Sequence, residues 1–176
     1  MIITRDIINK SIQFRDSDKT WYPRNLYDVK ALNTKIDQYK NYLVDQGAKP
    51  GQSAVIGFYP GIDQLDSFFA LCELGMSFTV NDYRVYEVND DVDFIDTKTK
   101  MLMPISYFLD IANVSEKKRD FFKRICDKCI TDEDVKDYRD DPNDLILANP
   151  GDIVMKCTSS GTTGTPKLVE HTQEFL

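Results

Sequence analysis

A strand, a helix and a second strand follow one another within residues 53–80, and this order constrains the fold more than any other feature of the sequence. Residues 53–59 form a short, largely apolar run of the kind that fits a buried parallel strand. Residues 63–74 have the length of a helix that Gly75 ends, and residues 77–80 form a second strand. A unit of this kind is right-handed, and its strands are parallel. The pattern predicts an α/β fold, a mostly parallel sheet flanked by helices.

Helix and strand patterns also flank this unit. Apolar residues recur at three- and four-residue intervals from Val29 to Leu43, which predicts an amphipathic helix that Gly47 ends. Further along, the sequence predicts a helix at 115–125, an acidic loop with a short helical turn at 131–144, a short strand at 145–147, a turn at 149–151 and a strand at 152–157.

Other stretches give weaker signals. Residues 82–96 alternate apolar and polar side chains and could hold one or two strands, whereas residues 101–112 mix signals around Pro104 and predict no boundary. Residues 1–20 are polar and are expected to form an N-terminal arm or a short helix. Residues 21–176 are then expected to form one α/β subdomain.

The charge balance argues against some classes of partner. The chain has 22 Lys and Arg against 29 Asp and Glu, a net charge of −7. An acidic protein repels nucleic acids and anionic membranes unless a basic patch outweighs the field. The one dense basic stretch, residues 117–124, lies on a predicted helix and is interpreted as a solvated face with acidic partners. We expect no nucleic-acid or membrane partner.

The size and hydropathy of the chain are those of a globular protein. The 176 residues are 41% hydrophobic and 29% charged, and a chain of this length can bury an ordinary core. No run of about 18 apolar residues is present, so no transmembrane helix is predicted. The first residues carry an early acid and no continuous apolar stretch, which argues against a secretory signal and for the cytoplasm.

Two of the four cysteines, Cys126 and Cys129, have a spacing that some metal sites use. A zinc site requires four ligands, and the chain has a single histidine, His171. The two cysteines are therefore interpreted as neighbours on one face of a helix, and no metal-ligating residue is predicted.

The segment with the clearest chemistry is residues 158–167, which follows a predicted strand. Its residues, all but one of them Gly, Ser, Thr or Lys, are Thr158, Ser159, Ser160, Gly161, Thr162, Thr163, Gly164, Thr165, Pro166 and Lys167. Small residues let backbone N–H groups turn toward an anion, hydroxyls add donors, and lysine adds a point charge. Residues 168–176 could start a helix whose N-terminus favours the same anion. The composition predicts phosphate binding.

This segment is not the common nucleotide P-loop. Its glycines are three residues apart rather than five, and no Ser or Thr follows the lysine to hold magnesium. The competing interpretation is a flexible polar loop that connects two elements.

The ordered string Ser-Gly-Thr-Thr-Gly-Thr-Pro-Lys at 160–167 resembles the phosphate-loop signature of the adenylate-forming superfamily, which includes acyl-CoA synthetases, luciferases and peptide-synthetase adenylation domains. Residues 43–56 are similar to that family's entry into its first strand, and residues 68–75 to its next helix. The likeness covers most of residues 21–176 and is weak in 82–145. It implies the N-terminal part of an adenylate-forming fold.

The resemblance also implies roles for individual residues. Ser160, Gly161, Thr162, Thr163 and Gly164 would hold the β- and γ-phosphates of ATP, with Thr158, Ser159 and Thr165 in the same binding segment. Lys167 would steady the phosphates and the departing pyrophosphate, as the catalytic residue. The family reaction is ATP- and Mg²⁺-dependent adenylation of a carboxylate, usually followed by transfer to coenzyme A.

The sequence departs from the family pattern in two places after the lysine. Leu168 stands where the family usually has glycine, and Gln173 stands where it commonly has histidine. His171 is therefore not the family histidine, and a surface position is expected for it.

The family's remaining site residues lie downstream of the loop, and this chain ends nine residues after Lys167. We therefore expect a truncated, acyl-CoA-synthetase-like ligase that is inactive alone and that a second chain completes. One alternative is a non-catalytic module that binds a nucleotide or phosphate. The other is a structural fragment that self-associates as a homo-oligomer, because a sheet without its neighbouring domain exposes apolar faces.

Overall fold

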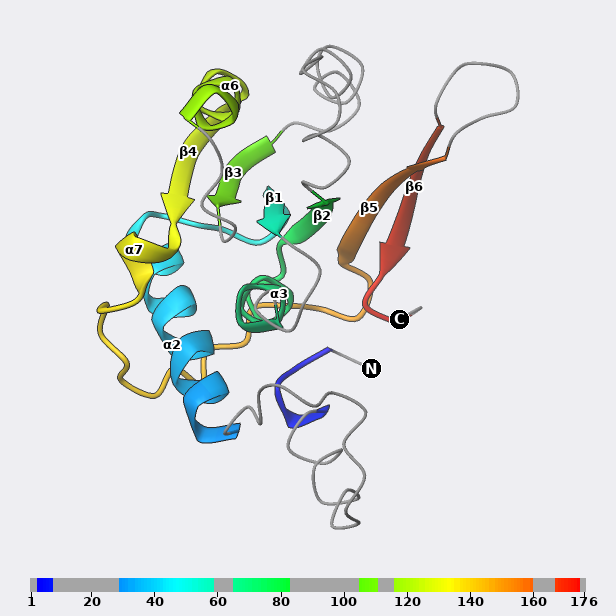
Figure 1. Ribbon diagram of the computed structural model, residues 1–176. Coiled ribbons are helices and arrows are strands. Elements are labelled where there is room, and N and C mark those ends of the chain that lie inside the picture. The colour runs from blue at the N-terminus through cyan, green and yellow to red at the C-terminus, as the bar shows by residue number, and fades with distance from the viewer. Residues whose placement is uncertain are drawn as a thin grey trace, which may run out of the picture.

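The fold is a six-stranded sheet with helices on both of its sides (Figure 1). The computed structural model describes residues 3–7, 29–58, 65–82, 105–110, 116–159 and 167–174. The helices are α2 (Val29–Asp45), α3 (Leu65–Glu73), α6 (Glu116–Ile125) and α7 (Asp132–Val135). The strands are β1 (Ser53–Phe58), β2 (Ser77–Asp82), β3 (Ile105–Asp110), β4 (Cys126–Thr131), β5 (Ile153–Ser159) and β6 (Lys167–Thr172).

The strand order is β4-β3-β1-β2-β5-β6, and every neighbouring pair is parallel except β5 with β6. The predicted strand–helix–strand unit is β1, α3 and β2, and its two strands pair in parallel with Ser53 opposite Ser77. The mostly parallel α/β fold is therefore confirmed. None of the helices in the described residues is long and apolar enough to cross a membrane.

Helix α2 is the amphipathic helix that the spacing of apolar residues predicts. Ile36 and Leu43 are fully buried, and Tyr39 is nearly so. Gly47 ends the helix with a φ of 82°, a conformation that favours glycine. The N–H of Ala48 donates to the carbonyl of Leu43 at 2.9 Å, which satisfies one of the last helical carbonyls.

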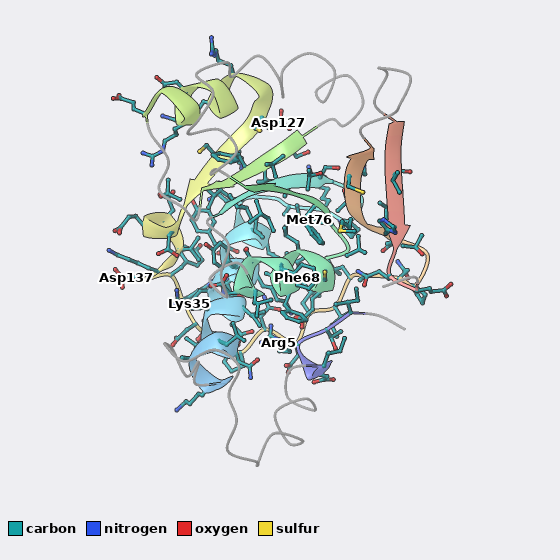
Figure 2. The ribbon with its side chains drawn as sticks, turned by 45° about the vertical axis from the view of Figure 1, so that its right-hand side comes forward. Arg5, Lys35, Phe68, Met76, Asp127 and Asp137 are labelled. Atoms are coloured by element: carbon teal, nitrogen blue, oxygen red, sulfur yellow. The ribbon has the colours of Figure 1, made fainter. Side chains whose placement is uncertain are left out.

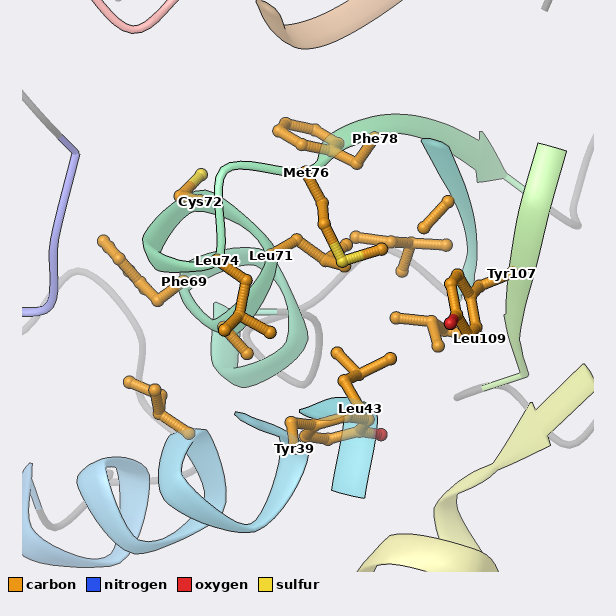
Figure 3. Packing of buried hydrophobic residues seen from close by; sticks show 14 of the residues in the cluster. Tyr39, Leu43, Phe69, Leu71, Cys72, Leu74, Met76, Phe78, Tyr107 and Leu109 are labelled. Atoms are coloured by element: carbon orange, nitrogen blue, oxygen red, sulfur yellow. The ribbon is translucent and has the colours of Figure 1, made fainter. Parts of the chain in front are cut away.

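The core lies between the sheet and the pair α2 and α3, while α6 lies on the other side of the sheet (Figures 1 and 2). Leu71 and Met76 point toward the sheet, and Tyr107 and Leu109 of β3 meet them from its face (Figure 3). All four are at most 3% exposed. Cutting a buried leucine back to alanine in such a core costs about 2–5 kcal/mol.

Some predictions of secondary structure were wrong. Cys126 and Cys129 lie on β4 rather than on a helix, and because side chains alternate along a strand, residues three apart face opposite sides. No group of three potential metal-ligating side chains (His, Cys, Asp or Glu) occurs among the described residues. Residues 145–147 are not a strand, because the N–H of Leu147 donates to the carbonyl of Glu73 instead. Strand β3 was not predicted.

Other predictions lie wholly or partly outside the described residues. The strands suggested within 82–96 fall there, except for Asp82, which ends β2. The division at residue 20 falls there too. Residues 3–7 of the expected arm are described, and Ile3 is buried against the core. The acidic loop has its short helical turn as α7, and residues 149–151 form a turn in which the N–H of Asp152 donates to the carbonyl of Asn149.

Candidate functional site

The predicted phosphate segment joins the two strands of an antiparallel hairpin, β5 and β6. Ser159, the last residue of β5, pairs with Lys167, the first residue of β6. Of the predicted site residues, Thr158, Ser159 and Lys167 belong to these strands, and residues 160–166 lie outside the described part of the chain. The structure therefore brings the two ends of the segment together across one strand pair.

The hairpin occupies one end of the sheet, with β6 as the edge strand (Figure 1). Strand β5 runs parallel to β2, so Ser159 lies at the same edge of the sheet as the carboxyl ends of β1 and β2. Ligands of open α/β sheets bind outside the carboxyl ends of the strands. The predicted segment therefore begins and ends at the edge where such folds place ligands.

The helix expected after Lys167 was wrong for residues 167–172, which form β6. Each of Lys167, Leu168, Val169, Glu170 and His171 has a partner in the ladder with β5. A strand also fits this sequence because the β-branched residues Val169 and Thr172 favour a pleated sheet. No helix dipole from residues 167–172 therefore acts on the segment.

Polar side chains connect the hairpin to the neighbouring strands. Thr79 Oγ1 donates to the carbonyl of Lys156 at 3.0 Å, and Lys156 Nζ donates to Ser53 Oγ at 3.2 Å. Ser53 Oγ lies 2.7 Å from Ser77 Oγ. Lys156 Nζ also lies 3.8 Å from a carboxylate oxygen of Glu170 on β6. Lys156 therefore links β5 both to the central strand β1 and to the edge strand β6.

The base of the hairpin is fixed to the C-terminal end of α3. Asp152 precedes β5 and Gln173 follows β6, so the two residues lie at the base of the hairpin. The N–H of Gln173 donates to the carbonyl of Asp152 at 3.0 Å. Gly75, with a φ of 69°, lies so close that a Cβ there would sit 3.2 Å from Asp152 Oδ2 and from Ala148 Cα. The close approach of the two backbones requires glycine at this position.

His171 is half-buried on β6 rather than in a surface loop. Its Nε2 lies 4.0 Å from Cys157 Sγ of β5. The two side chains lie on one face of the hairpin, since Met155 pairs with His171 and alternate residues along β5 share a face.

A second group of charged residues lies away from the hairpin, between the N-terminal segment, α2 and α3. We call Arg5, Asp37, Lys40 and Glu73 the charge cluster. Arg5 Nη1 lies 2.6 Å from Asp37 Oδ1, and Arg5 Nη2 lies 3.0 Å from Glu73 Oε2. Lys40 Nζ lies 2.7 Å from Glu73 Oε2 and donates to the carbonyl of Asn143 at 2.6 Å. Figure 2 shows Arg5 near the two helices.

Burial and pairing act in opposite directions on the pKa values of the charge cluster. Burial by itself raises the pKa of Glu73, but hydrogen bonds from Arg5 and Lys40 outweigh it and hold the pKa below its ordinary value of 4.5. Burial lowers the pKa of Lys40 despite its carboxylate partners. Nearby, burial and the charge of Glu73 raise the pKa of the Cys72 thiol, so Cys72 is an inert, protonated core residue.

The charge cluster was not predicted from sequence. Arg5 and Glu73 are 68 residues apart, and no local pattern marks such a pair. The four side chains satisfy one another inside the protein, which distinguishes them from the segment at 158–167, where the residue types favour a bound anion.

Comparisons with known proteins show what the fold is similar to. A scan against models of protein families finds no match. Among solved structures, the chain is similar to VinN, with a TM-score of 0.66 and 17% identity over 97% of this chain and 43% of VinN. It is similar to McyG A-PCP complexed with phenylalanyl-adenylate, with a TM-score of 0.73 and 16% identity over 98% of this chain and 33% of that one.

The N-terminal domain of FACL13 from Mycobacterium tuberculosis is a third similar structure, with a TM-score of 0.61 and 18% identity over 83% of this chain and 37% of that one. The chain thus spans less than half the length of each of these solved chains. At such identities the likeness concerns the fold. The chain has the fold of the N-terminal part of adenylate-forming enzymes.

Proposed function

We propose that this chain binds the phosphates of ATP at the β5–β6 hairpin and thereby contributes the phosphate-binding part of an adenylate-forming ligase. The observation that carries the proposal is the pairing of Ser159 with Lys167 at the carboxyl edge of the parallel sheet. A segment of small and hydroxylated residues connects this pair. Position and composition therefore favour the same ligand, a polyphosphate.

The residue types supply the donors that an anion requires. Backbone N–H groups at Gly161 and Gly164 can approach a phosphate closely because no Cβ intervenes. The hydroxyls of Thr162 and Thr163 add donors, and Lys167 adds a positive charge at the end of the segment. In an acidic protein of net charge −7, this local set of donors would have to offset the repulsion of the whole chain for ATP.

The proposed reaction is the attack of a substrate carboxylate on the α-phosphate of ATP, which forms an acyl-adenylate and releases pyrophosphate. Residues 160–164 would hold the β- and γ-phosphates, and Lys167 would stabilise the charge that develops on the departing pyrophosphate. Magnesium would enter with ATP as its counter-ion. Coenzyme A is the proposed acceptor of the acyl group in a following step.

The whole reaction requires residues that bind adenine, ribose and the carboxylate substrate. The solved chains with this fold are at least twice as long as the part this chain matches, and we propose that a further polypeptide segment or a second chain supplies those residues. Carboxylate-dependent exchange of pyrophosphate into ATP, measured with and without such a partner, tests this step. Exchange that never exceeds the background with any partner argues against a ligase role.

Calorimetric titration with Mg-ATP tests binding by the chain itself. The Lys167→Ala variant is expected to bind at least about tenfold more weakly, because one charge-assisted contact to phosphate is lost. Lys49→Ala is the matched control, since Lys49 is an exposed lysine in the loop that leads into β1, at the opposite edge of the sheet. It removes the same charge and should leave the affinity within about twofold.

Two results would reject the binding proposal. One is the absence of saturable heat from a wild-type chain that circular dichroism shows to be folded. The other is an equal loss of affinity in Lys167→Ala and Lys49→Ala, which would mean that ATP responds to net charge rather than to the hairpin.

A further inference from the structure

The side chain of Gln173 connects three parts of the molecule that are distant in sequence. Ile3 donates its N–H to Gln173 Oε1 at 2.9 Å, and Gln173 Nε2 donates to the carbonyl of Cys72 at 3.0 Å. The residue is 1% exposed. An amide is well suited to this place, because one end accepts from the N-terminal segment while the other donates to the C-terminal end of α3.

The same residue closes the base of the β5–β6 hairpin. Its backbone N–H donates to the carbonyl of Asp152, and the next N–H, of Glu174, donates to the carbonyl of Pro150. The residues just before β5 are bound to α3 as well, through the N–H groups of Leu147 and Ala148, which donate to the carbonyl of Glu73. Both strands of the hairpin therefore leave from one fixed point at the end of α3.

The remaining attachment of the hairpin to the sheet is narrow. Over the described strands, the ladder between β2 and β5 registers the single pair Phe78 with Met155, whereas β1 and β2 pair along their whole length. Beyond that pair, Thr79 and Lys156 supply side-chain hydrogen bonds. The angle of the hairpin relative to the sheet thus depends strongly on what holds its base.

A small change in the tilt of the hairpin at its base becomes a larger displacement at its far end. Gln173 follows Lys167 by six positions, which is about 20 Å of extended strand. A tilt of about 3° at the base therefore moves the far end by about 1 Å, a displacement large enough to weaken a site built from fixed donors.

We propose that Gln173 is a positioning residue for phosphate binding: it fixes the base of the β5–β6 hairpin to the end of α3 and so sets where the backbone of Ser159 and Lys167 lies. The inference rests on the proposed function of the hairpin. Gln173 is expected to touch no part of the nucleotide, since it lies at the opposite end of β6 from the phosphate segment.

The test compares Gln173→Met with Asn41→Leu. Each variant keeps approximate side-chain size and removes a buried amide that makes long-range hydrogen bonds, since Asn41 is 4% exposed and donates to the carbonyls of Arg139 and Asp141. Both should lose stability, but Gln173→Met should weaken Mg-ATP affinity about tenfold and Asn41→Leu less than about twofold. Amide hydrogen exchange within 153–159 and 167–172 should accelerate in Gln173→Met alone.

A Gln173→Glu variant separates positioning from folding. A protonated carboxyl can accept from Ile3 and donate to Cys72 as the amide does, whereas the ionised form has no donor. The affinity of Gln173→Glu relative to wild type at the same pH should therefore recover as the pH falls from 8 to about 6, because burial raises a carboxyl pKa. This comparison remains decisive if Gln173→Met does not fold.

The outcomes distinguish this inference from the proposed function. If the wild type binds no Mg-ATP, the proposed function fails and the role in phosphate binding fails with it, while exchange still reports whether Gln173 holds the hairpin. If the wild type binds but Gln173→Met matches Asn41→Leu in affinity and exchange, or Gln173→Glu shows no recovery at lower pH, the positioning role of Gln173 is refuted and phosphate binding stands.

Discussion

The charge cluster and the β5–β6 hairpin use charged residues in opposite ways. In the charge cluster, two cations and two carboxylates pair with one another, and the side chains of Lys40 and Glu73 are 0% and 2% exposed. In the hairpin, Lys167 stands at the carboxyl edge of the sheet, beside a segment of anion-favouring residues. Breaking a buried ion pair is costly for stability, and ligands of open α/β sheets bind at the carboxyl ends of the strands, where we propose that Lys167 acts.

This contrast predicts that substitutions separate into two classes. Those in the charge cluster should lower the free energy of unfolding without a direct effect on the affinity of the folded state for ligand. Those in the hairpin should change ligand affinity with little effect on unfolding. The four predictions below run from the largest expected loss of stability to the smallest.

Glu73→Ala should have the largest effect. It leaves the buried Lys40 and the partly buried Arg5 without their shared carboxylate, and breaking a buried pair costs about 3–5 kcal/mol. Urea denaturation measures the loss in the free energy of unfolding. Glu133→Ala is the control, because Glu133 pairs with Lys136 on the surface and should cost less than about 1 kcal/mol. Similar losses in the free energy of unfolding in Glu73→Ala and Glu133→Ala would show that the charge cluster contributes no more to stability than a surface ion pair does.

Gly75→Ala should cost more than Gly51→Ala, although both glycines have positive φ values, 69° and 81°. The strained backbone alone costs about 1–2 kcal/mol in each variant. Only at Gly75 would the new Cβ meet backbone, since nothing lies within 4 Å of it at Gly51. Thermal unfolding of the two variants should therefore rank Gly75→Ala as the less stable, and equal melting temperatures would contradict the close approach.

Stability should fall as the pH falls, and Glu73 should account for part of the loss. The pKa of Glu73 lies below its ordinary value of 4.5 because Arg5 and Lys40 outweigh the effect of burial. A carboxyl with a lowered folded pKa contributes stability above its unfolded pKa and loses it as the pH drops through the folded pKa. Below about pH 4.5, the free energy of unfolding should decline more steeply in wild type than in Glu73→Gln.

Asp37 also faces Arg5 in the charge cluster, so Asp37→Asn serves as the comparison for that decline. A wild-type curve that runs parallel to that of Glu73→Gln between pH 5 and 3 would show that Glu73 does not carry the dependence.

Lys167→Ala should have the smallest effect on unfolding, within about 0.5 kcal/mol, as expected of a substitution at the end of an edge strand. The same variant is the one expected to lose Mg-ATP affinity most clearly. A large loss in the free energy of unfolding would show that Lys167 affects stability as the charge cluster does, and would contradict the division into two classes.

The parts of the fold that could be predicted from sequence are those with local physical causes. Gly47 and Gly75 end α2 and α3 because each adopts a positive φ that other residues avoid. The apolar spacing along α2 and the short apolar run of β1 need no knowledge of distant residues. The family resemblance at 160–167 likewise comes from adjacent residues, and it led to a fold that the solved structures share.

The parts that were missed depend on partners far along the chain. Residues 126–131 form a strand that pairs with β3, and residues 167–172 form a strand that pairs with β5. A short run of mixed residues fits both a helix and a strand until its pairing partner is known. Residues 145–147 failed to form a strand because α3 offered a carbonyl to Leu147. Gln173 has no distinctive neighbours in sequence, and its role follows only from contacts with Ile3 and Cys72.

The contact between Ile3 and Gln173 has a consequence for how the protein is assembled during synthesis. Its two residues are 170 positions apart, so the amide of Ile3 has no acceptor in Gln173 until residue 173 has left the ribosome. Residues 29–82 meanwhile supply α2, α3 and the two central strands, β1 and β2. Ribosome-bound chains that stop before residue 153 should therefore already contain the paired helices and central strands, while the β5–β6 hairpin is added last.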